Sequence, residues 1–451
     1  MEVPDVTLST KEAMITLRGL SEGLPIPLPA FLTIGYFLEQ GVLTAAERHE
    51  AFETLLRQSS ESHAYVPQRF ESDGKHPFFD TQPDGRAVVR PPKDEDPTHL
   101  PPSLFWCNLN VADDACLTEF HTLLGLNYVE DEDSMFRFQY PKHFLRWALT
   151  PPGHYPNWHI GYRRNSDGAL VGSITGIPRT TRVGATSALV CEPNFVCLDK
   201  SLRKSPDRLS HALFKELLRR TNWDGVVSGM FSTGAELPRP VAEAAFHHRT
   251  LNTRKLCDVM YGMIPPGRTI EWLEEQNLLP AAPSEEKNMR PMRQSDVVNV
   301  RRLVNMAQNM NCALSLEYTN AEASHWFLPQ PGFLHSYVVE SEDGTDVTDF
   351  ISFYTLPNAV LRHSLHKELR QSFLLSYASN KGPLITLVEN ALIIARDMGH
   401  DVFIAMGTHR ADEFVDALLF TEGTGSLYYY LYNWAEGFGE VPASMVGIPN
   451  F

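Results

Sequence analysis

Two stretches, Trp147-Ala-Leu-Thr-Pro-Pro-Gly153 and Trp326-Phe-Leu-Pro-Gln-Pro-Gly332, are copies of one pattern and carry most of the information about the fold. Each follows a helical stretch and precedes an apolar strand, an Asp-Gly pair and a second strand that runs to a proline, Pro178 or Pro357. The tryptophans, the glycines and the final prolines all repeat after 179 residues. An Asp-Gly pair between apolar runs indicates a hairpin, because glycine accepts positive φ without steric cost. The spacing therefore predicts two copies of one α/β unit.

This duplication sets the expected domain organisation. We expect an N-terminal helical extension and linker over residues 1–75, a first half over 76–285 and a second half over 286–451. Apolar residues at three- and four-residue spacing predict helices over 31–40 and 44–57. A helix, a hairpin, a strand and a further helix in each half predict an α/β fold with a mixed sheet flanked by helices.

Composition excludes several classes of protein. The chain has 451 residues, of which 43% are hydrophobic and 21% charged, so it can bury large cores and is not a disordered tail. A formal charge of −16 argues against nucleic-acid binding and favours basic partners. The six cysteines form no CxxC pair, and the N-terminus has no basic segment followed by an apolar one. We therefore expect reduced thiols, no secretory signal, no transmembrane segment and a cytoplasmic location.

A basic loop is the strongest candidate for an anion site. A short strand over 195–198 leads into a loop with four cations, and a helix follows from about residue 211. The N-terminus of a helix presents free N–H groups to phosphate. The alternative is an ordinary solvated loop before a helix. Pro193 inside the strand predicts a bulge or an edge, where backbone N–H groups leave the ladder.

Sequence evidence for other catalytic or binding sites is weaker. There is no P-loop, GxSxG or HExxH motif, and the 17 histidines lack the spacing of metal ligands, so we expect no metal site. The acidic run 130–133 is either a solvated loop or a surface that receives a basic peptide. The aromatic run 428–434 predicts a strand that lies mostly in the core.

Six motifs in order give the chain a resemblance to a known family. They are Phe78-Phe-Asp-Thr-Gln-Pro83, the segment from Asn127 to Phe138 (NYVEDEDSMFRF), Glu192-Pro-Asn-Phe-Val-Cys197, His248-Arg-Thr-Leu-Asn252, Asp349-Phe-Ile-Ser-Phe-Tyr-Thr-Leu-Pro357 and Tyr429-Tyr-Leu-Tyr-Asn-Trp434. From about His76 to the C-terminus the chain resembles the N-myristoyltransferases, or glycylpeptide N-tetradecanoyltransferases. The resemblance implies two tandem GNAT-like (acyl-CoA N-acyltransferase) halves, which agrees with the duplication.

The resemblance also implies a reaction and its catalytic groups. The family transfers a myristoyl chain from myristoyl-CoA, a co-substrate rather than a bound cofactor, to the amine of an N-terminal glycine. Its oxyanion hole matches the backbone N–H groups of Phe195 and Val196. Its base, the C-terminal carboxylate, matches Phe451, and Ser232 matches a threonine that assists near the amine.

Binding residues follow from the same resemblance. For myristoyl-CoA they are Phe78, Phe79, Cys197, Leu198, Arg203, Ser205, Arg208, Leu209 and Ser210. For the peptide they are Tyr128, Asp131, Asp133, Tyr140, Phe246, His248, Asn358 and Thr424. The expected partners are myristoyl-CoA and proteins or peptides with an N-terminal glycine, including Lys-containing ones, and the expected state is a monomer.

Departures from the family pattern identify a divergent member. The phosphate loop is two residues longer and carries Asp207, and Thr424 replaces the aspartate of the GxGDG turn. Two groove tyrosines are Phe246 and Phe373, and a groove asparagine is Ile404. The first hypothesis is an active transferase with a shifted peptide preference. The alternative is a weakened paralogue that binds acyl-CoA or N-terminal glycine peptides without efficient turnover. A third, an acetyltransferase of another amine, fits the duplicated motifs least.

Overall fold

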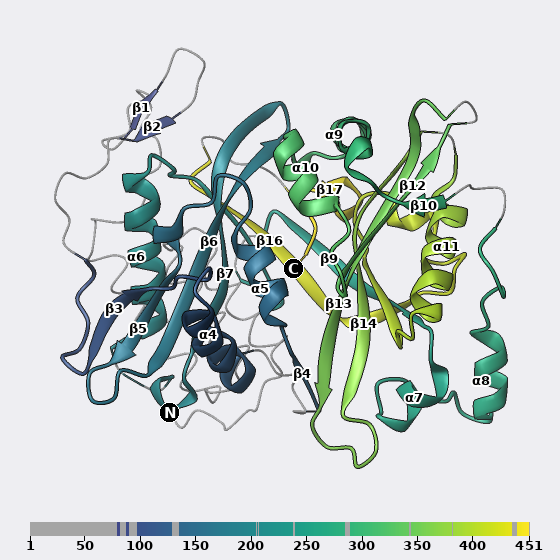
Figure 1. The fold of residues 1–451 in the computed structure, drawn as a ribbon, viewed down its shortest axis with the longest axis horizontal. Coiled ribbons are helices and arrows are strands. Elements are labelled where there is room, and N and C mark those ends of the chain that lie inside the picture. The colour runs from purple at the N-terminus through teal and green to yellow at the C-terminus, as the bar shows by residue number, and fades with distance from the viewer. Residues whose placement is uncertain are drawn as a thin grey trace, which may run out of the picture.

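The computed structural model describes residues 97–128, 135–203, 205, 207–237, 240–284, 289–341, 344–380, 382–434 and 440–450. Before them it describes the backbone of two short paired strands, β1 (Phe79–Thr81) and β2 (Ala87–Val89). One sheet of 15 strands runs through the described chain, and helices cover it (Figure 1). The helices predicted over 31–40 and 44–57, and the boundary expected at 285 and 286, lie outside the described residues.

Two sets of elements repeat in the same order. The first set is β3 (Leu104–Asn108), α4 (Asp114–Asn127), β4 (Phe136–Phe138), α5 (Lys142–Leu149), β5 (Ile160–Arg164), β6 (Leu170–Val183), β7 (Thr186–Leu198), α6 (Leu209–Trp223), β8 (Gly229–Thr233) and β9 (Ala242–Thr250). The helices α7 (Thr253–Asp258) and α8 (Ile270–Gln276) connect it to the second set. That set is β10 (Met289–Pro291), α9 (Val297–Asn311), β11 (Leu314–Leu316), α10 (Asn320–Phe327), β12 (Leu334–Glu340), β13 (Val347–Val360), β14 (Glu368–Ser379), α11 (Leu384–Asp397), β15 (Val402–Met406) and β16 (Thr421–Tyr432), and β17 (Val446–Gly447) follows it.

The predicted hairpins are present in both sets. Strands β5 and β6 pair antiparallel around Gly168 (φ 71°), and β12 and β13 do so around Gly344 (φ 69°). The strands predicted to end at Pro178 and Pro357 run past these prolines, β6 to Val183 and β13 to Val360. Proline removes one N–H donor from a ladder, but its carbonyl still accepts, as Pro357 does from the Gln139 N–H at 3.0 Å.

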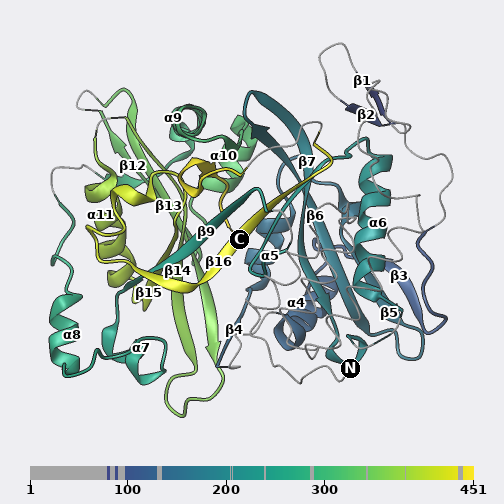
Figure 2. The same ribbon diagram turned by 180° about the vertical axis from the view of Figure 1, so that it is seen from behind.

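Each set completes its sheet with the last strand of the other. Strands β7 and β8 pair in parallel, as do β14 and β15. Strand β16 then pairs with β8 of the first set, whereas β9 pairs with β15 of the second. Strands β9 and β16 pair with each other between the two sets, as both ribbon views show (Figures 1 and 2). The exchange makes one continuous sheet out of two units.

Helix α11 illustrates how the sequence produces these layers. Its buried residues Leu384, Leu387, Val388 and Ala391 follow the i, i+3, i+4, i+7 spacing of one helix face. They belong to a cluster that includes Ile351 of β13 and Phe403 of β15. Helix α6 buries its own apolar face against the strands of the first set in the same way.

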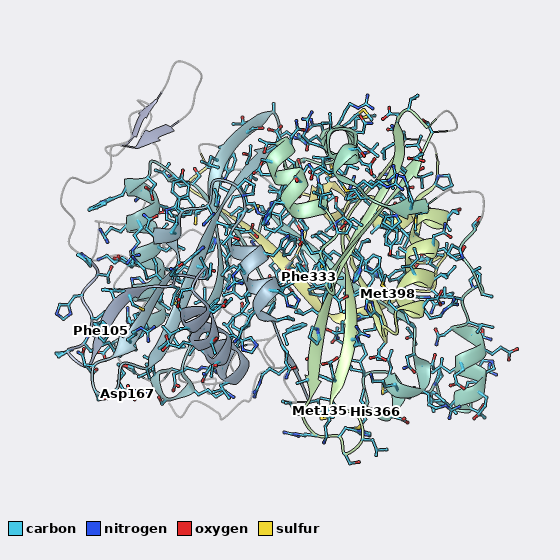
Figure 3. The ribbon with its side chains drawn as sticks, viewed as in Figure 1. Phe105, Met135, Asp167, Phe333, His366 and Met398 are labelled. Carbon is cyan, nitrogen blue, oxygen red and sulfur yellow. The ribbon has the colours of Figure 1, made fainter. Side chains whose placement is uncertain are left out.

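The repeated tryptophans meet between the two sets. The rings of Trp147 and Trp326 lie 4.9 Å apart, and the Trp147 indole N–H donates to the carbonyl of His325 at 2.9 Å. Phe333 packs on Trp147 and on Phe144, with ring centroids 5.4 and 5.9 Å away, at the middle of the molecule (Figure 3). The residues that revealed the duplication in the sequence therefore form the contact between its two copies.

Candidate active site

A pocket of about 560 Å³ lies where the two sets of strands meet. Residues of β7, β8, β9, β13, β14, β15 and β16 line it, so both halves build it. It brings together nine of the residues predicted from the sequence: Tyr128, Tyr140, Phe195, Val196, Ser232, Phe246, His248, Asn358 and Thr424. The wall is mostly aromatic and aliphatic, which suits an apolar ligand with a few polar anchors.

A β-bulge in β7 confirms the irregularity that Pro193 predicts. The register to β6 pairs Thr175 with Asn194 and Ser173 with Cys197, so two residues of β7, Phe195 and Val196, lie opposite one residue of β6. Phe195 has a φ of 50°, a strained value for a residue with a side chain. Its N–H donates to the Oδ1 atom of Asn194 at 2.7 Å rather than to the ladder. The bulge thus takes the Phe195 N–H out of the ladder in a segment that lines the pocket.

Aromatic packing holds this bulge in place. The Phe195 ring is buried at 1% exposure and contacts the rings of Tyr140, Tyr128 and Phe120 at centroid distances of 5.1, 6.0 and 6.1 Å. Burial also raises the pKa of the Tyr140 hydroxyl far above its usual value, so this group stays neutral. The side chain anchors the bulge, and the backbone is the part that can act on a ligand.

The start of helix α6 combines two features of an anion site. Arg208 caps the helix with φ 49°, and the first N–H groups of any helix have no partner within it. The Ser210 side chain is 1% exposed, and its hydroxyl has no hydrogen-bond partner among the described residues. A buried hydroxyl without a partner at a helix N-terminus fits an acceptor such as a phosphate oxygen.

Other predicted loop residues contact the protein itself. Arg203 is 6% exposed, and its guanidinium donates to the carbonyls of Leu198, at 3.3 Å, and of Asn127. The Ser205 hydroxyl donates to Asp207 at 2.7 Å. Leu209 is buried and its carbonyl accepts from the Tyr162 hydroxyl.

Cys197 and Leu198 lie in β7 next to the bulge, each at 1% exposure. Burial raises the pKa of the Cys197 thiol to about 12, so this cysteine is a poor nucleophile at neutral pH. Neither residue lines the pocket, so the binding role expected for the pair stays a prediction.

The C-terminal segment enters the pocket. Strand β17 pairs in parallel with β11, and the Gln308 amide donates to the Gly447 carbonyl at 3.1 Å. The Tyr354 hydroxyl donates to the Asn450 carbonyl at 3.0 Å, and Asn450 lines the pocket. The residue before the predicted base is therefore in the site.

His248 stands on β9 in the pocket wall. Its Nδ1 atom lies 2.8 Å from the Tyr261 hydroxyl, and burial lowers its pKa to about 4. The ring is neutral at pH 7 and too weakly basic to hold a proton there. Ser232 on β8 and Thr424 on β16 are both exposed towards the pocket and present hydroxyl groups.

Some predicted residues cannot be placed, and some pocket residues were not predicted. Phe78, Asp131, Asp133 and Phe451 lie outside the described residues, and only the backbone of Phe79 is described. The pocket also contains Tyr261, Tyr354 and Gln371, which the sequence analysis missed. No signal in the sequence singles out Gln371, because it lies among the polar residues Glu368, Arg370 and Ser372 of β14.

The described residues contain neither a membrane-spanning helix nor a metal-binding group. None of the described helices combines the length and the apolar content needed to cross a membrane. Likewise, the described His, Cys, Asp and Glu side chains form no group of three that could hold a metal ion.

Comparisons with known proteins agree with this geometry. The family model described as Myristoyl-CoA:protein N-myristoyltransferase, N-terminal domain, matches residues 89–244, and the model of its C-terminal domain matches residues 258–444. Glycylpeptide N-tetradecanoyltransferase 2 of Danio rerio is 38% identical over 371 residues, 80% of this chain and 74% of that protein. Glycylpeptide N-tetradecanoyltransferase 1 of Arabidopsis thaliana is 36% identical over 85% of this chain and 90% of that protein.

A solved structure extends the likeness to three dimensions. The crystal structure of Saccharomyces cerevisiae N-myristoyltransferase with bound myristoyl-CoA superposes with a TM-score of 0.75 at 31% identity, over 81% of this chain and 90% of that one. Because both domain models match and the relatives align over most of their length, this chain belongs to the N-myristoyltransferase family.

Proposed function

We propose that this chain is an N-acyltransferase that moves a myristoyl group from myristoyl-CoA to the amine of an N-terminal glycine. The observation that carries the proposal is the bulge at Phe195 and Val196, two residues that line a pocket built by both halves. The names of the relatives and the myristoyl-CoA in the yeast structure indicate the acyl donor.

In the proposed reaction the glycine nitrogen attacks the thioester carbonyl carbon directly. The C–N bond forms, the C–S bond breaks, and CoA leaves as a thiol. The N–H groups of Phe195 and Val196 stabilise the negative charge that develops on the carbonyl oxygen. To do so, the Phe195 N–H must exchange its hydrogen bond to the Asn194 side chain for one to the oxyanion. A donor of this kind lowers the barrier by about 3 kcal/mol.

The amine must lose protons, and the described pocket wall offers few bases. Glu192 accepts from the Arg179 Nε at 2.7 Å, and His248 has a pKa of about 4. We assign the role of base to the α-carboxylate of Phe451, which follows the pocket residue Asn450. Its reference pKa of about 3.5 rises when it is desolvated, which makes it a better base. Ser232 assists as a hydrogen-bonding hydroxyl beside the amine.

The start of α6 takes the pyrophosphate of CoA in this proposal. Ser210 supplies a hydroxyl without a partner among the described residues, Arg208 a positive charge, and the helix its N-terminal N–H groups. Lys-containing peptides would meet the acidic run at 130–133, and we expect a monomer that acts in the cytoplasm.

The test measures CoA release from myristoyl-CoA by the purified chain. A panel of Gly-starting octapeptides, with and without downstream lysines, is compared with the same peptides acetylated at the glycine. We expect release and a myristoylated product with free glycine only. Tight binding of myristoyl-CoA without release for any peptide would refute the transferase and support the binding-only alternative. Absence of binding would refute both.

A further inference from the structure

Two buried amide oxygens in the pocket wall have no hydrogen-bond partner in the described part of the chain. They are Oδ1 of Asn358 on β13 and Oε1 of Gln371 on β14. The two residues are 5% and 2% exposed. An acceptor that is buried without a partner destabilises the free protein, so such pairs call for an explanation.

The strand register places these two side chains on one face. Leu356 pairs with Gln371 across β13 and β14, and Asn358 follows Leu356 by two residues. Asn358 and Gln371 are thus diagonal neighbours, with Cα atoms about 7–8 Å apart. Their side chains are long enough to bring both oxygens to a single donor group of a ligand.

The surroundings exclude a charged ligand group at this point. Phe138, Phe373 and Ile404 lie on the adjoining strands and also line the pocket. Among the described pocket residues Glu192 is the one carboxylate, and it already pairs with Arg179. At Asn358 and Gln371 a buried ammonium would lack a counter-charge among the described residues, since the Phe451 carboxylate is assigned to the glycine amine, and a carboxylate would face two acceptors.

We propose that Asn358 and Gln371 form a specificity pocket for a primary amide side chain, Asn or Gln, of the acceptor protein; this inference rests on the proposed function. One –NH₂ group carries two N–H donors and can bridge two oxygens up to about 5 Å apart with bonds of about 2.9 Å. A hydroxyl carries one donor and satisfies one oxygen. The amide satisfies both acceptors without bringing a charge into an apolar wall.

The experiment uses Gly-starting octapeptides whose other residues are alanine, with one asparagine placed in turn at each of positions two to seven. Asp and Leu, which have nearly the same shape, and Ser replace it in matched peptides. The readout is kcat/KM for CoA release. At one position we expect Asn to exceed Leu by about tenfold or more and Asp to be the poorest, because a site built for hydrogen bonds rejects groups that leave it unpaired.

Two variants connect the preference to these residues. Gln371→Met keeps the length of the side chain and removes the acceptor, so the preference for Asn over Leu should fall to about two- to threefold or less. Gln139→Met, the same change at an exposed residue beside the pocket strand β4, should retain the preference.

The outcomes separate this inference from the proposed function. Turnover with equal kcat/KM for Asn, Leu and Ala at every position would overturn the amide pocket and leave the transferase intact. A preference for Asn that survives Gln371→Met would also overturn it. Failure of every peptide to react would overturn the transferase and the amide pocket together.

Discussion

Val196 contributes its backbone rather than its side chain to the proposed oxyanion hole. Val196→Pro removes the N–H donor, and we expect kcat to fall about 10²- to 10³-fold while the affinity for myristoyl-CoA is unchanged. Val196→Leu keeps the donor and should retain most of the activity. Near-ultraviolet circular dichroism would verify that both variants are folded. Equal activity of the proline variant and the wild type would exclude this N–H from catalysis.

Residue-level prediction from the sequence was accurate where a motif fixes a backbone shape. Pro193 predicted a bulge or an edge in this strand, and a bulge is present at the nearby residues Phe195 and Val196. Prediction failed for Gln371, because nothing in a single sequence states which face of a strand borders a cavity. The roles of Arg203 and Ser205 stay predictions, since both side chains contact the protein in the free chain.

The C-terminal segment is the element on which the proposed base depends. Tyr354→Phe removes the hydrogen bond from its hydroxyl to the Asn450 carbonyl. We expect kcat to fall about tenfold, because a small displacement of a catalytic group is costly, while the KM for myristoyl-CoA stays the same. Presteady-state measurement of the acyl-transfer rate of Tyr354→Phe at saturating myristoyl-CoA would test this prediction. An unchanged kcat would mean that other contacts suffice to hold the segment.

Extension of the same element tests the base itself. Four added residues after Phe451 would move the carboxylate out of the pocket, so turnover should be lost while myristoyl-CoA still binds. Isothermal titration with myristoyl-CoA and the CoA-release assay give the two readouts. Full turnover by the extended chain would remove the carboxylate from the mechanism.

A buried ion pair within the first set of elements also contacts a tryptophan of the second set. Arg179 of β6 donates to Glu192 of β7 at 2.7 Å, and its guanidinium lies 4.0 Å from the ring of Trp326 on α10. Arg179→Met leaves the Glu192 carboxylate buried without this partner, which should lower the free energy of unfolding by about 3–5 kcal/mol. Urea titration measures it. The double variant Arg179→Met, Glu192→Gln should recover part of the lost free energy of unfolding. An Arg179→Met variant as stable as the wild type would contradict this prediction.

The elements themselves show what a sequence can and cannot predict. The repeated tryptophan pattern predicted two copies of one α/β unit, since local spacing determines hairpins and helix faces. It did not predict that β9 and β16 exchange between the copies, because strand pairing across the sheet depends on contacts far apart in the sequence. The pocket lies at this exchange, so the sequence could name its residues only through the family resemblance.

The whole molecule should lose stability in mild acid. Burial lowers the pKa of six described histidines to about 4: His159, His248, His325, His335, His400 and His409. Between about pH 6.5 and 4 the unfolded chain binds protons at these sites and the folded chain does not. The free energy of unfolding therefore falls as the pH is lowered through this window.

His400 offers a test of that pH dependence. Its Nδ1 lies 2.5 Å from the Ser372 hydroxyl, and its own share of the loss is up to about 3 kcal/mol between pH 6.5 and 4. Urea titrations at pH 7.5, 6 and 5 should show a smaller decrease for His400→Gln than for the wild type. The same pH dependence in both proteins would show that the pKa of His400 is not lowered by folding.

The proposed function consists of one reaction at one pocket. In a single-turnover experiment the chain is first bound to myristoyl-CoA, and this complex is then mixed with a Gly-starting octapeptide. The reaction is quenched with acid, and the peptide and the protein are analysed by mass spectrometry. We predict that one myristoyl group per chain appears on the glycine amine, that one CoA is released, and that the protein mass never changes. Myristoyl-CoA recovered intact with every peptide, or a myristoyl group found on the protein itself, would contradict it.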